Sequence, residues 1–393
     1  MKKLIITATI YVMTMTSNVL ADIKMGIILG FTGPIESLTP AMAASAELAF
    51  KEASDSGSLL GGEKISIERA DSTCVDSAAA TTAAEGLVSG GVVAIMGADC
   101  SGVTGAIATN VAVPNGVVMI SPSATSPGLT DLNDNGYFFR TAPSDARGGQ
   151  VLADITKDRK VKSIAVTHTN NDYGKGLADV YVAAVKAHGI NVTAVTAHEE
   201  GKGDYGAEVA TLAAAGGDAL AVLGYLDQAG GMIIQGSLDS GAYDVFVLSD
   251  GMIGDSLTDR FGKDLNKSFG SLPGSTGKGA GKFAEVAKAG GIDSSGPYTG
   301  ESYDAAALIA LSMQAGGNAD RGTIQANVMN VANAPGTKIY PGELKKALDL
   351  LAKGKKVNYE GATGVEFTDV GEAFGSFLEK EIKGGKFKTK KQR

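Results

Sequence analysis

The most constraining feature of this sequence is a regular alternation between short β-rich runs and longer segments with helical periodicity. Such alternation is typical of βαβ units, which build parallel sheets covered by helices. Strands are predicted over residues 23–29, 64–70, 92–96, 117–120, 137–140, 163–167, 192–197, 219–223 and 245–248. Helices are predicted between them over residues 39–53, 77–90, 101–112, 146–158, 174–188, 205–215, 228–238 and 254–261. The pattern therefore predicts an α/β protein with two doubly wound parallel sheets and a ligand cleft beyond the carboxyl ends of their strands.

The last third of the chain departs from this alternation. A stretch rich in Gly, Ser and Pro (residues 268–281) precedes three helical segments that have no strands between them, 282–289, 302–315 and 343–353. Two short strand-like runs follow, 365–368 and 374–379. The final segment, 383–393, carries six basic residues and no acidic one, which predicts a solvated tail.

Length and composition narrow the function classes. A chain of 393 residues corresponds to about two domains. Its 44% hydrophobic and 20% charged residues argue against a disordered protein or a coiled coil. Acidic residues outnumber basic ones by 43 to 35, so the clustered positive charge that nucleic-acid binding requires is not expected.

The first 21 residues have the pattern of a secretory signal peptide. Lys2 and Lys3 form a short positive region, residues 4–15 are largely apolar, and Ala21 provides a small residue for cleavage. A buried N-terminal strand is the alternative. No later segment has 18 consecutive apolar residues, so we expect a soluble exported protein.

Export gives the two cysteines a role, because oxidising compartments favour disulfides. Cys74 and Cys100 are the only cysteines, and each follows a predicted strand. We therefore expect them to pair with each other. The three histidines show no metal-ligand spacing, and the sequence predicts neither a metal site nor a cofactor.

Polar motifs follow successive strands in a distinctive order. They are Gly30-Phe31-Thr32-Gly33-Pro34, Asp71-Ser72-Thr73-Cys74, Asp99-Cys100-Ser101-Gly102, Ile120-Ser121-Pro122-Ser123-Ala124-Thr125-Ser126-Pro127, Asn171-Asp172-Tyr173-Gly174, Gly224-Tyr225 and Ser249-Asp250-Gly251-Met252. Together they make the chain resemble the periplasmic leucine/isoleucine/valine-type amino-acid-binding proteins, which feed ABC importers. The resemblance spans nearly the whole chain after residue 21.

This resemblance implies a type I periplasmic binding fold, in which two lobes joined by three crossing strands close on a ligand. Lobe 1 would comprise residues 22–142 and 275–359, and lobe 2 residues 143–274 and 360–393. It also implies the disulfide between Cys74 and Cys100. The protein would be a non-enzymatic monomer of the periplasm that captures a free amino acid and delivers it to an ABC permease in the inner membrane.

A free amino acid needs an anion site for its carboxylate and a negative counter-charge for its ammonium group. Ser101 lies at a predicted helix N-terminus, where unpaired N–H groups favour an anion. By resemblance, Thr125 shares this carboxylate and the backbone carbonyl of Ser123 accepts from the ammonium group. Helix capping alone is the alternative role for Ser101.

The resemblance assigns the opposite wall of the site to the second lobe. Asp250 matches an acidic residue, usually Glu, that pairs with the ammonium group, although it could instead cap the next helix. Tyr173 and Tyr225 match aromatic residues that reach the ligand. Leu38 stands where the family has an aromatic residue, and with Phe31 it leaves an apolar wall that favours aliphatic or other neutral side chains.

Two alternatives remain at this point. Within the same fold, the chain could bind amides, urea or other small carboxylates, ligands that do not require Asp250 as a buried counter-charge. The second alternative is an exported α/β enzyme, because Gly201-Lys202-Gly203-Asp204-Tyr205-Gly206 has dinucleotide-binding spacing and Asp227 lies after the next strand. Glu199 and Glu200 argue against this, since they place two negative charges beside the supposed pyrophosphate site.

Overall fold

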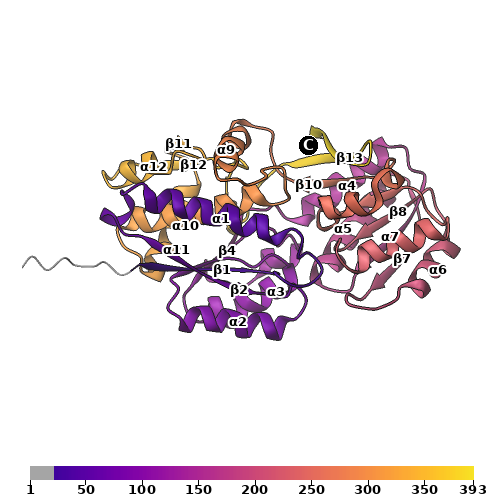
Figure 1. Cartoon of the computed structure of the whole chain (residues 1–393), viewed down its shortest axis with the longest axis horizontal. Coiled ribbons are helices and arrows are strands. Elements are labelled where there is room, and N and C mark those ends of the chain that lie inside the picture. Colours follow the sequence, from indigo (N-terminus) through magenta and orange to yellow (C-terminus); the bar gives the residue numbers. More distant parts are fainter. Residues whose placement is uncertain (1–21) are drawn as a thin grey trace, which may run out of the picture.

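The computed structural model describes residues 22–393 and arranges them around two sheets that lie side by side along the long axis (Figure 1). The signal peptide expected over residues 1–21 lies outside the described part. The first sheet has five parallel strands in the order β2-β1-β3-β4-β5. They are β1 (Ile23–Leu29), β2 (Ile65–Asp71), β3 (Ala94–Gly97), β4 (Val118–Ser121) and β5 (Phe138–Arg140).

Helices cover both faces of this sheet, with α1 and α10 above it and α2 and α3 below it in Figure 1. The helices of this half are α1 (Thr39–Asp55), α2 (Ser77–Ser89), α3 (Ser101–Ile107), α9 (Lys278–Ala289), α10 (Thr299–Gly316), α11 (Arg321–Ala332) and α12 (Leu344–Leu351). A small parallel pair, β11 (Thr337–Ile339) and β12 (Val357–Tyr359), lies beside them. Strands β3 and β4 are buried along their whole length, as expected for a sheet covered on both faces.

The second sheet has seven strands in the order β14-β13-β10-β9-β8-β6-β7. Its parallel strands are β6 (Ser163–Thr169), β7 (Asn191–His198), β8 (Ala219–Leu223), β9 (Phe246–Leu248) and β10 (Phe269–Pro273). Antiparallel strands β13 (Phe377–Ile382) and β14 (Phe387–Gln392) complete one edge. Its helices are α4 (Asp145–Asp158), α5 (Asp172–Ala187), α6 (Gly206–Ala215), α7 (Ala229–Asp239) and α8 (Asp255–Phe261).

The chain passes between the two halves three times, after β5, after β10 and after β12. The predicted α/β fold with two wound parallel sheets is therefore confirmed. Among the helices of residues 22–393, none is both long enough and apolar enough to cross a bilayer.

Short polar residues set where several helices begin. Asp76 Oδ1 accepts hydrogen bonds from the N–H groups of Ala78 and Ala79, each at 3.0 Å, at the start of α2. Asn171 Oδ1 accepts from Gly174 N–H at 3.0 Å at the start of α5. Such caps satisfy backbone donors that have no partner within the helix. The cap at Asn171 also fixes the first turn of α5, which carries Tyr173.

Strand β10 lies inside the stretch rich in Gly, Ser and Pro (residues 268–281), for which no strand was predicted. Gly270 explains how a strand can form in a stretch of this composition. A Cβ atom at this residue would lie 2.2 Å from the backbone oxygen of Leu248 on the neighbouring strand. Glycine is therefore required by the close approach of β10 to β9, although glycine and proline in a sequence usually argue against a strand.

One further prediction near the end of the chain was wrong, and one helix was missed. Residues 365–368 form no strand and contribute one isolated bridge, between Phe367 and Ala373. Helix α11 was not predicted, because its hydrophobic periodicity is weak.

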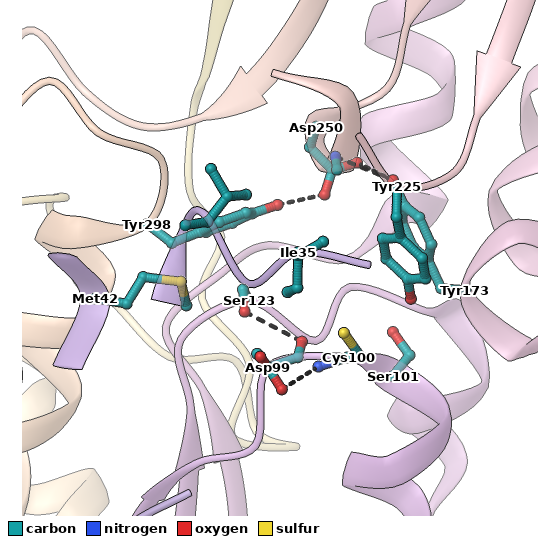
Figure 2. A pocket seen from close by; sticks show the side chains of 12 residues that line it. Ile35, Met42, Asp99, Cys100, Ser101, Ser123, Tyr173, Tyr225, Asp250 and Tyr298 are labelled. Carbon is teal, nitrogen blue, oxygen red and sulfur yellow. Dashed lines mark hydrogen bonds between the residues drawn. The ribbon is translucent and has the colours of Figure 1, made fainter. Parts of the chain in front are cut away.

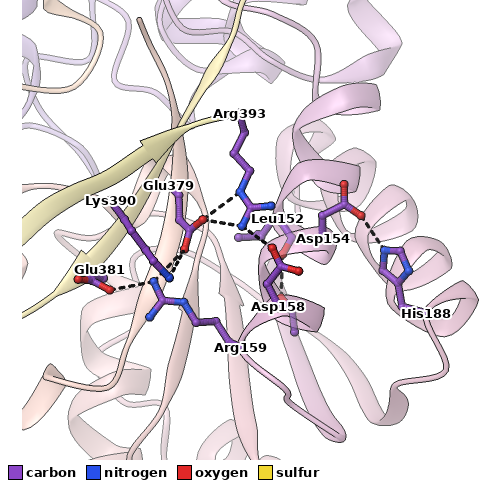
Figure 3. Close-up of polar contacts among 10 residues, drawn as sticks. Leu152, Asp154, Asp158, Arg159, His188, Glu379, Glu381, Lys390 and Arg393 are labelled. Carbon is purple, nitrogen blue, oxygen red and sulfur yellow. Dashed lines mark hydrogen bonds and ion pairs between the residues drawn. The ribbon is translucent and has the colours of Figure 1, made fainter. Parts of the chain in front are cut away.

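Most of the basic segment 383–393 is not a solvated tail but forms the edge strand β14, which ion pairs hold in place (Figure 3). The fully buried Glu379 carboxylate contacts the guanidinium of Arg159 at 2.9 Å, that of Arg393 at 2.5 Å, and Lys390 Nζ at 3.4 Å. Burial acts to raise the pKa of Glu379, but the two guanidinium groups hold it below its usual value. Lysine side chains on an exposed edge also discourage pairing with other chains, so the basic composition suits an edge strand.

Candidate functional site

A pocket lies where the two halves meet (Figure 2). Residues from both halves line it. The first half contributes Ile35, Leu38, Met42, Asp99, Cys100, Ser101, Ser123 and Tyr298, and the second contributes Tyr173, Tyr225, Asp250 and Gly251. Six of the seven residues predicted to bind a ligand are therefore brought together. The exception is Thr125, which is not part of the lining.

Ser101 is the first residue of α3 and is almost fully buried. Its Oγ accepts a hydrogen bond from Ser126 N–H at 3.0 Å, so its own hydroxyl proton remains available to a ligand. Helix α3 continues into a π-helical turn at residues 108–112, so the amides at the start of α3 head a longer helical segment. A hydroxyl donor and a helix N-terminus together favour a bound anion.

Ser123 and Thr125 follow strand β4. Ser123 lines the pocket, and its hydroxyl donates to the backbone oxygen of Asp99 at 3.1 Å. Thr125 lies behind the lining, and its carbonyl accepts from Asp145 N–H at 2.8 Å. Its Oγ1 is buried and has no hydrogen-bond partner within residues 22–393. The Thr125 side chain lies close to the Asp145 carboxyl group and acts to lower its pKa, and this structure does not bring it into the lining.

Asp250 is the only carboxylate of the second half that lines the pocket in the described part of the chain. It lies in a short 3-10 turn directly after β9 and is 8% exposed. One oxygen accepts from the hydroxyl of Tyr173 at 2.6 Å, and the other accepts from the hydroxyl of Tyr298. Burial raises the pKa of Asp250, while the two phenol donors oppose that shift. The arrangement places an acidic group in the pocket wall, where a cation would favour its charged form.

Tyr298 was missed by the sequence analysis. It precedes α10, in a left-handed conformation with φ of 58°, and its ring closes the pocket opposite Tyr173. Because 48 positions separate it from Asp250 and no motif surrounds it, only the packing of α10 brings the two together.

Tyr173 and Tyr225 form one aromatic wall. Their rings stack with centroids 5.2 Å apart, and Asn171 Nδ2 donates to the Tyr225 hydroxyl at 3.4 Å. Burial raises the pKa of both phenols well above their usual value. Both hydroxyls therefore stay protonated and can donate hydrogen bonds near neutral pH.

The apolar wall differs in part from the prediction. Leu38 lines the pocket as expected, together with Ile35 and Met42. Phe31 does not, and its ring lies instead beneath the guanidinium of Arg69 at 5.5 Å. The loop after β1 turns Ile35 rather than Phe31 towards the cavity.

Asp99, which was not predicted as a site residue, fixes the loop that carries Ser101. Its carboxylate accepts from Gly30 N–H at 2.6 Å, Ser72 Oγ at 2.9 Å and Cys100 N–H at 3.0 Å. Burial raises the pKa of Asp99, and these three donors oppose that shift. Because its three donors all belong to the loops of the first half, Asp99 positions the loop that carries Ser101.

The sequence profile described as "Periplasmic binding protein" matches residues 22–342. The chain belongs to this family. It is accordingly a binding protein and not an enzyme. Among its relatives, "Leu/Ile/Val-binding protein homolog 1" of Brucella melitensis is 31% identical over 306 residues, 76% of this chain and 80% of that protein. "Leu/Ile/Val-binding protein homolog 3" of the same organism is also 31% identical, but that match covers 59% of this chain and 62% of the relative.

Solved structures of other binding proteins share the fold. A leucine-binding protein, LivK, from Thermotoga maritima superposes with a TM-score of 0.79 at 21% identity, covering 94% of this chain and 98% of the other. LivJ from Streptococcus pneumoniae, described as a branched-chain amino acid transporter substrate-binding protein in complex with isoleucine, gives 0.77 at 22% identity, covering 95% and 99%. At these identities the likeness establishes the type I periplasmic binding fold.

The expected disulfide is present in this periplasmic binding protein. Cys74 and Cys100 are bonded, with their Cα atoms 5.1 Å apart. The bond joins the loops after β2 and β3, next to Asp99 and Ser101. It therefore ties together two of the loops around the pocket.

The dinucleotide-binding alternative is wrong for this periplasmic binding protein. Segment 201–206 connects β7 to the first residue of α6, and Lys202 is paired with Glu208 rather than open to a phosphate. Asp227, the supposed ribose ligand, accepts hydrogen bonds from Ser37 and Ser256. The glycine spacing reflects a loop of the second half and not a phosphate cradle.

Proposed function

We propose that this protein captures a free α-amino acid with a neutral, aliphatic side chain and delivers it to an ABC permease in the inner membrane. The observation that carries the proposal is the buried Asp250 carboxylate, held by two phenol hydroxyls across the pocket from Ser101 and Ser123. A zwitterion matches this arrangement, because its ammonium group would face Asp250 and its carboxylate would face the start of α3. A buried charge without a partner is costly, so ligands lacking either group would bind weakly.

The side chain of the ligand would lie against Ile35, Leu38 and Met42. These apolar residues provide no partner for a charged side chain, which supports a neutral ligand. The names of the Brucella relatives, which are called Leu/Ile/Val-binding proteins, agree with this choice. Thr125 would reach the carboxylate only after an adjustment of its loop, because it lies outside the lining.

Binding would be coupled to closure of two lobes. In this proposal lobe 1 comprises residues 22–142 and 275–359, and lobe 2 comprises residues 143–274 and 360–393. A ligand that contacts both lobes stabilises the closed form by its differential affinity for that form. The permease would then recognise the closed protein.

The proposed location is the periplasm, reached through cleavage of a signal peptide after Ala21. The oxidised Cys74–Cys100 pair supports an oxidising compartment. We propose that the protein acts there as a monomer.

A thermal-shift screen of the purified protein against the twenty amino acids tests the proposal. A ligand present at 100 times its Kd should stabilise the protein by about 2.7 kcal/mol. We expect the largest shifts with neutral aliphatic amino acids, and isothermal titration calorimetry would then give their affinities. No shift with any amino acid would refute the proposal, and shifts with urea, amides or amine-free carboxylates would replace it with the other ligand class.

A further inference from the structure

A group of polar contacts joins the two halves at the edge of the pocket. Asp227, in the turn between β8 and α7, accepts from Ser37 N–H at 2.9 Å through one oxygen and from Ser256 Oγ at 3.0 Å through the other. The hydroxyls of Ser37 and Ser256 lie 3.2 Å apart, and Asp227 N–H donates to the backbone oxygen of Pro34 at 3.0 Å. Pro34 and Ser37 belong to the loop between β1 and α1, whereas Asp227 and Ser256 belong to the half built on the second sheet.

These contacts are continuous with the ligand pocket. Ser37 precedes the pocket residue Leu38, and Asp227 follows the pocket residue Tyr225 by two positions. The two halves also meet closely at Gly254, where a Cβ atom would lie 2.8 Å from Leu38 Cδ2. The polar contacts therefore form the outer margin of the surface that encloses a ligand.

We infer that Asp227, together with Ser37 and Ser256, forms a latch that holds the pocket closed and sets how slowly a ligand leaves. The inference rests on the proposed function, since it concerns release from that same pocket. Asp227 does not line the pocket, so it acts as a positioning residue rather than as a ligand contact.

The latch predicts a specific kinetic signature. A ligand binds first to the open form, in which the latch partners are apart, so the association rate should not depend on Asp227. Release requires reopening, so each latch bond that is lost shifts the closed–open equilibrium and raises the dissociation rate by the same factor. The contacts are half-buried or exposed, so a moderate effect is expected.

The first test compares Asp227→Ala with wild type in stopped-flow measurements, using the amino acid that gives the largest thermal shift. We expect the dissociation rate constant to rise about tenfold, because two hydrogen bonds to a carboxylate are lost. The association rate constant and the melting temperature of the ligand-free protein should stay unchanged. Asp227→Asn keeps an acceptor oxygen and should recover part of the slow dissociation.

The matched control is Asp239→Ala, at an exposed aspartate at the end of α7 in the same half. It should dissociate at the wild-type rate. A dissociation rate of Asp227→Ala within twofold of wild type would overturn the inference. A fall in the association rate constant by a similar factor would also overturn it, because that result indicates damage to the pocket.

The second test traps the closed form chemically. The Ser37→Cys/Ser256→Cys double variant, treated with a mild oxidant, should form a cross-link faster when the ligand is present, because the two hydroxyls it replaces are neighbours only when the halves meet. If the double variant binds the ligand but cross-links at the same rate with and without it, the latch is overturned. If wild type binds no amino acid, the proposed function fails instead, and that result is separate from either latch readout.

Discussion

Replacing Asp250 by Asn should weaken ligand binding while leaving the ligand-free protein at least as stable as wild type. Asparagine has nearly the same shape, and its amide can accept from one of the two tyrosine hydroxyls and donate to the other. The substitution therefore removes the charge and keeps the packing. The lost negative charge is the partner that the ammonium group of the proposed ligand needs in a buried site.

The magnitude follows from the burial of Asp250, which is 8% exposed. Breaking a buried ion pair by removing one partner costs about 3–5 kcal/mol. This corresponds to a loss in affinity on the order of a hundredfold to several thousandfold. The effect on the stability of the ligand-free protein has the opposite sign, so the substitution should not destabilise it. Burial raises the pKa of Asp250, which makes the charged form of this carboxyl group costly in the folded state.

The pH dependence provides an independent check of the same reasoning. As the pH falls through the raised pKa of Asp250, the carboxyl group takes up a proton and loses the charge that attracts the ammonium group. Affinity should therefore fall on acidification in wild type. Asp250→Asn should show a weaker dependence over the same range, because only neighbouring buried carboxyl groups such as Asp145, whose pKa burial also raises, still take up protons there.

Calorimetric titration and thermal melting of Asp250→Asn would measure both effects, with Asp239→Asn as the exposed control. The reasoning is refuted if Asp250→Asn binds the ligand within about threefold of wild type, a loss far below the 3 kcal/mol expected. A large drop in the melting temperature of the ligand-free variant would also contradict it, because Asp250 would then be needed mainly for folding.

Three further predictions concern stability. Reducing the Cys74–Cys100 bond, which closes a loop of 26 residues, should lower the free energy of unfolding by about 3.5 kcal/mol in the chain-entropy model. Urea denaturation with and without reductant measures this change, and equal midpoints would contradict it. Arg393→Ala should destabilise the protein by about 1–3 kcal/mol at neutral pH, because it removes a donor from the buried Glu379, and this difference should shrink as the pH falls below 4.5. Glu301→Gln should stabilise the protein most above pH 8: burial raises the Glu301 pKa from 4.5 to about 8, so wild type loses stability as the pH rises through that range and the variant does not. Parallel curves of melting temperature against pH for Glu301→Gln and wild type would show that this carboxyl group does not titrate as expected.

Much of the site could be predicted because its residues follow strands. The carboxyl ends of parallel strands meet at one edge of a sheet, which predicts a cleft there. The helix N-terminus favoured Ser101, and the family resemblance assigned Ser123, Tyr173, Tyr225 and Asp250 to the same cleft. Residues whose position depends on packing between distant segments could not be predicted. Tyr298 carries no local signal, yet the packing of α10 brings its hydroxyl to Asp250.

The end of the chain is a second place where the sequence could not predict the structure. Lysine-rich composition predicted a solvated tail, because sequence patterns report side-chain polarity and not backbone pairing. In the folded protein the lysines of β14 face solvent, while its backbone bonds to β13 and Arg393 reaches Glu379. Glycine and proline misled the prediction at β10 in a similar way, since Gly270 is needed for its close approach to β9.

The sequence by itself determined the α/β alternation, the cysteine pair and the strand ends at which the polar residues lie, because these depend on local periodicity and chain direction. Only the tertiary structure decided that Thr125 stays behind the lining, that Ile35 replaces Phe31 in the apolar wall, and that Asp227 bonds to Ser37 190 positions away. The physical reason is that hydrogen bonds and contacts across the pocket depend on how the two halves pack against each other. That packing is set by many weak contacts along the whole chain and by no single motif.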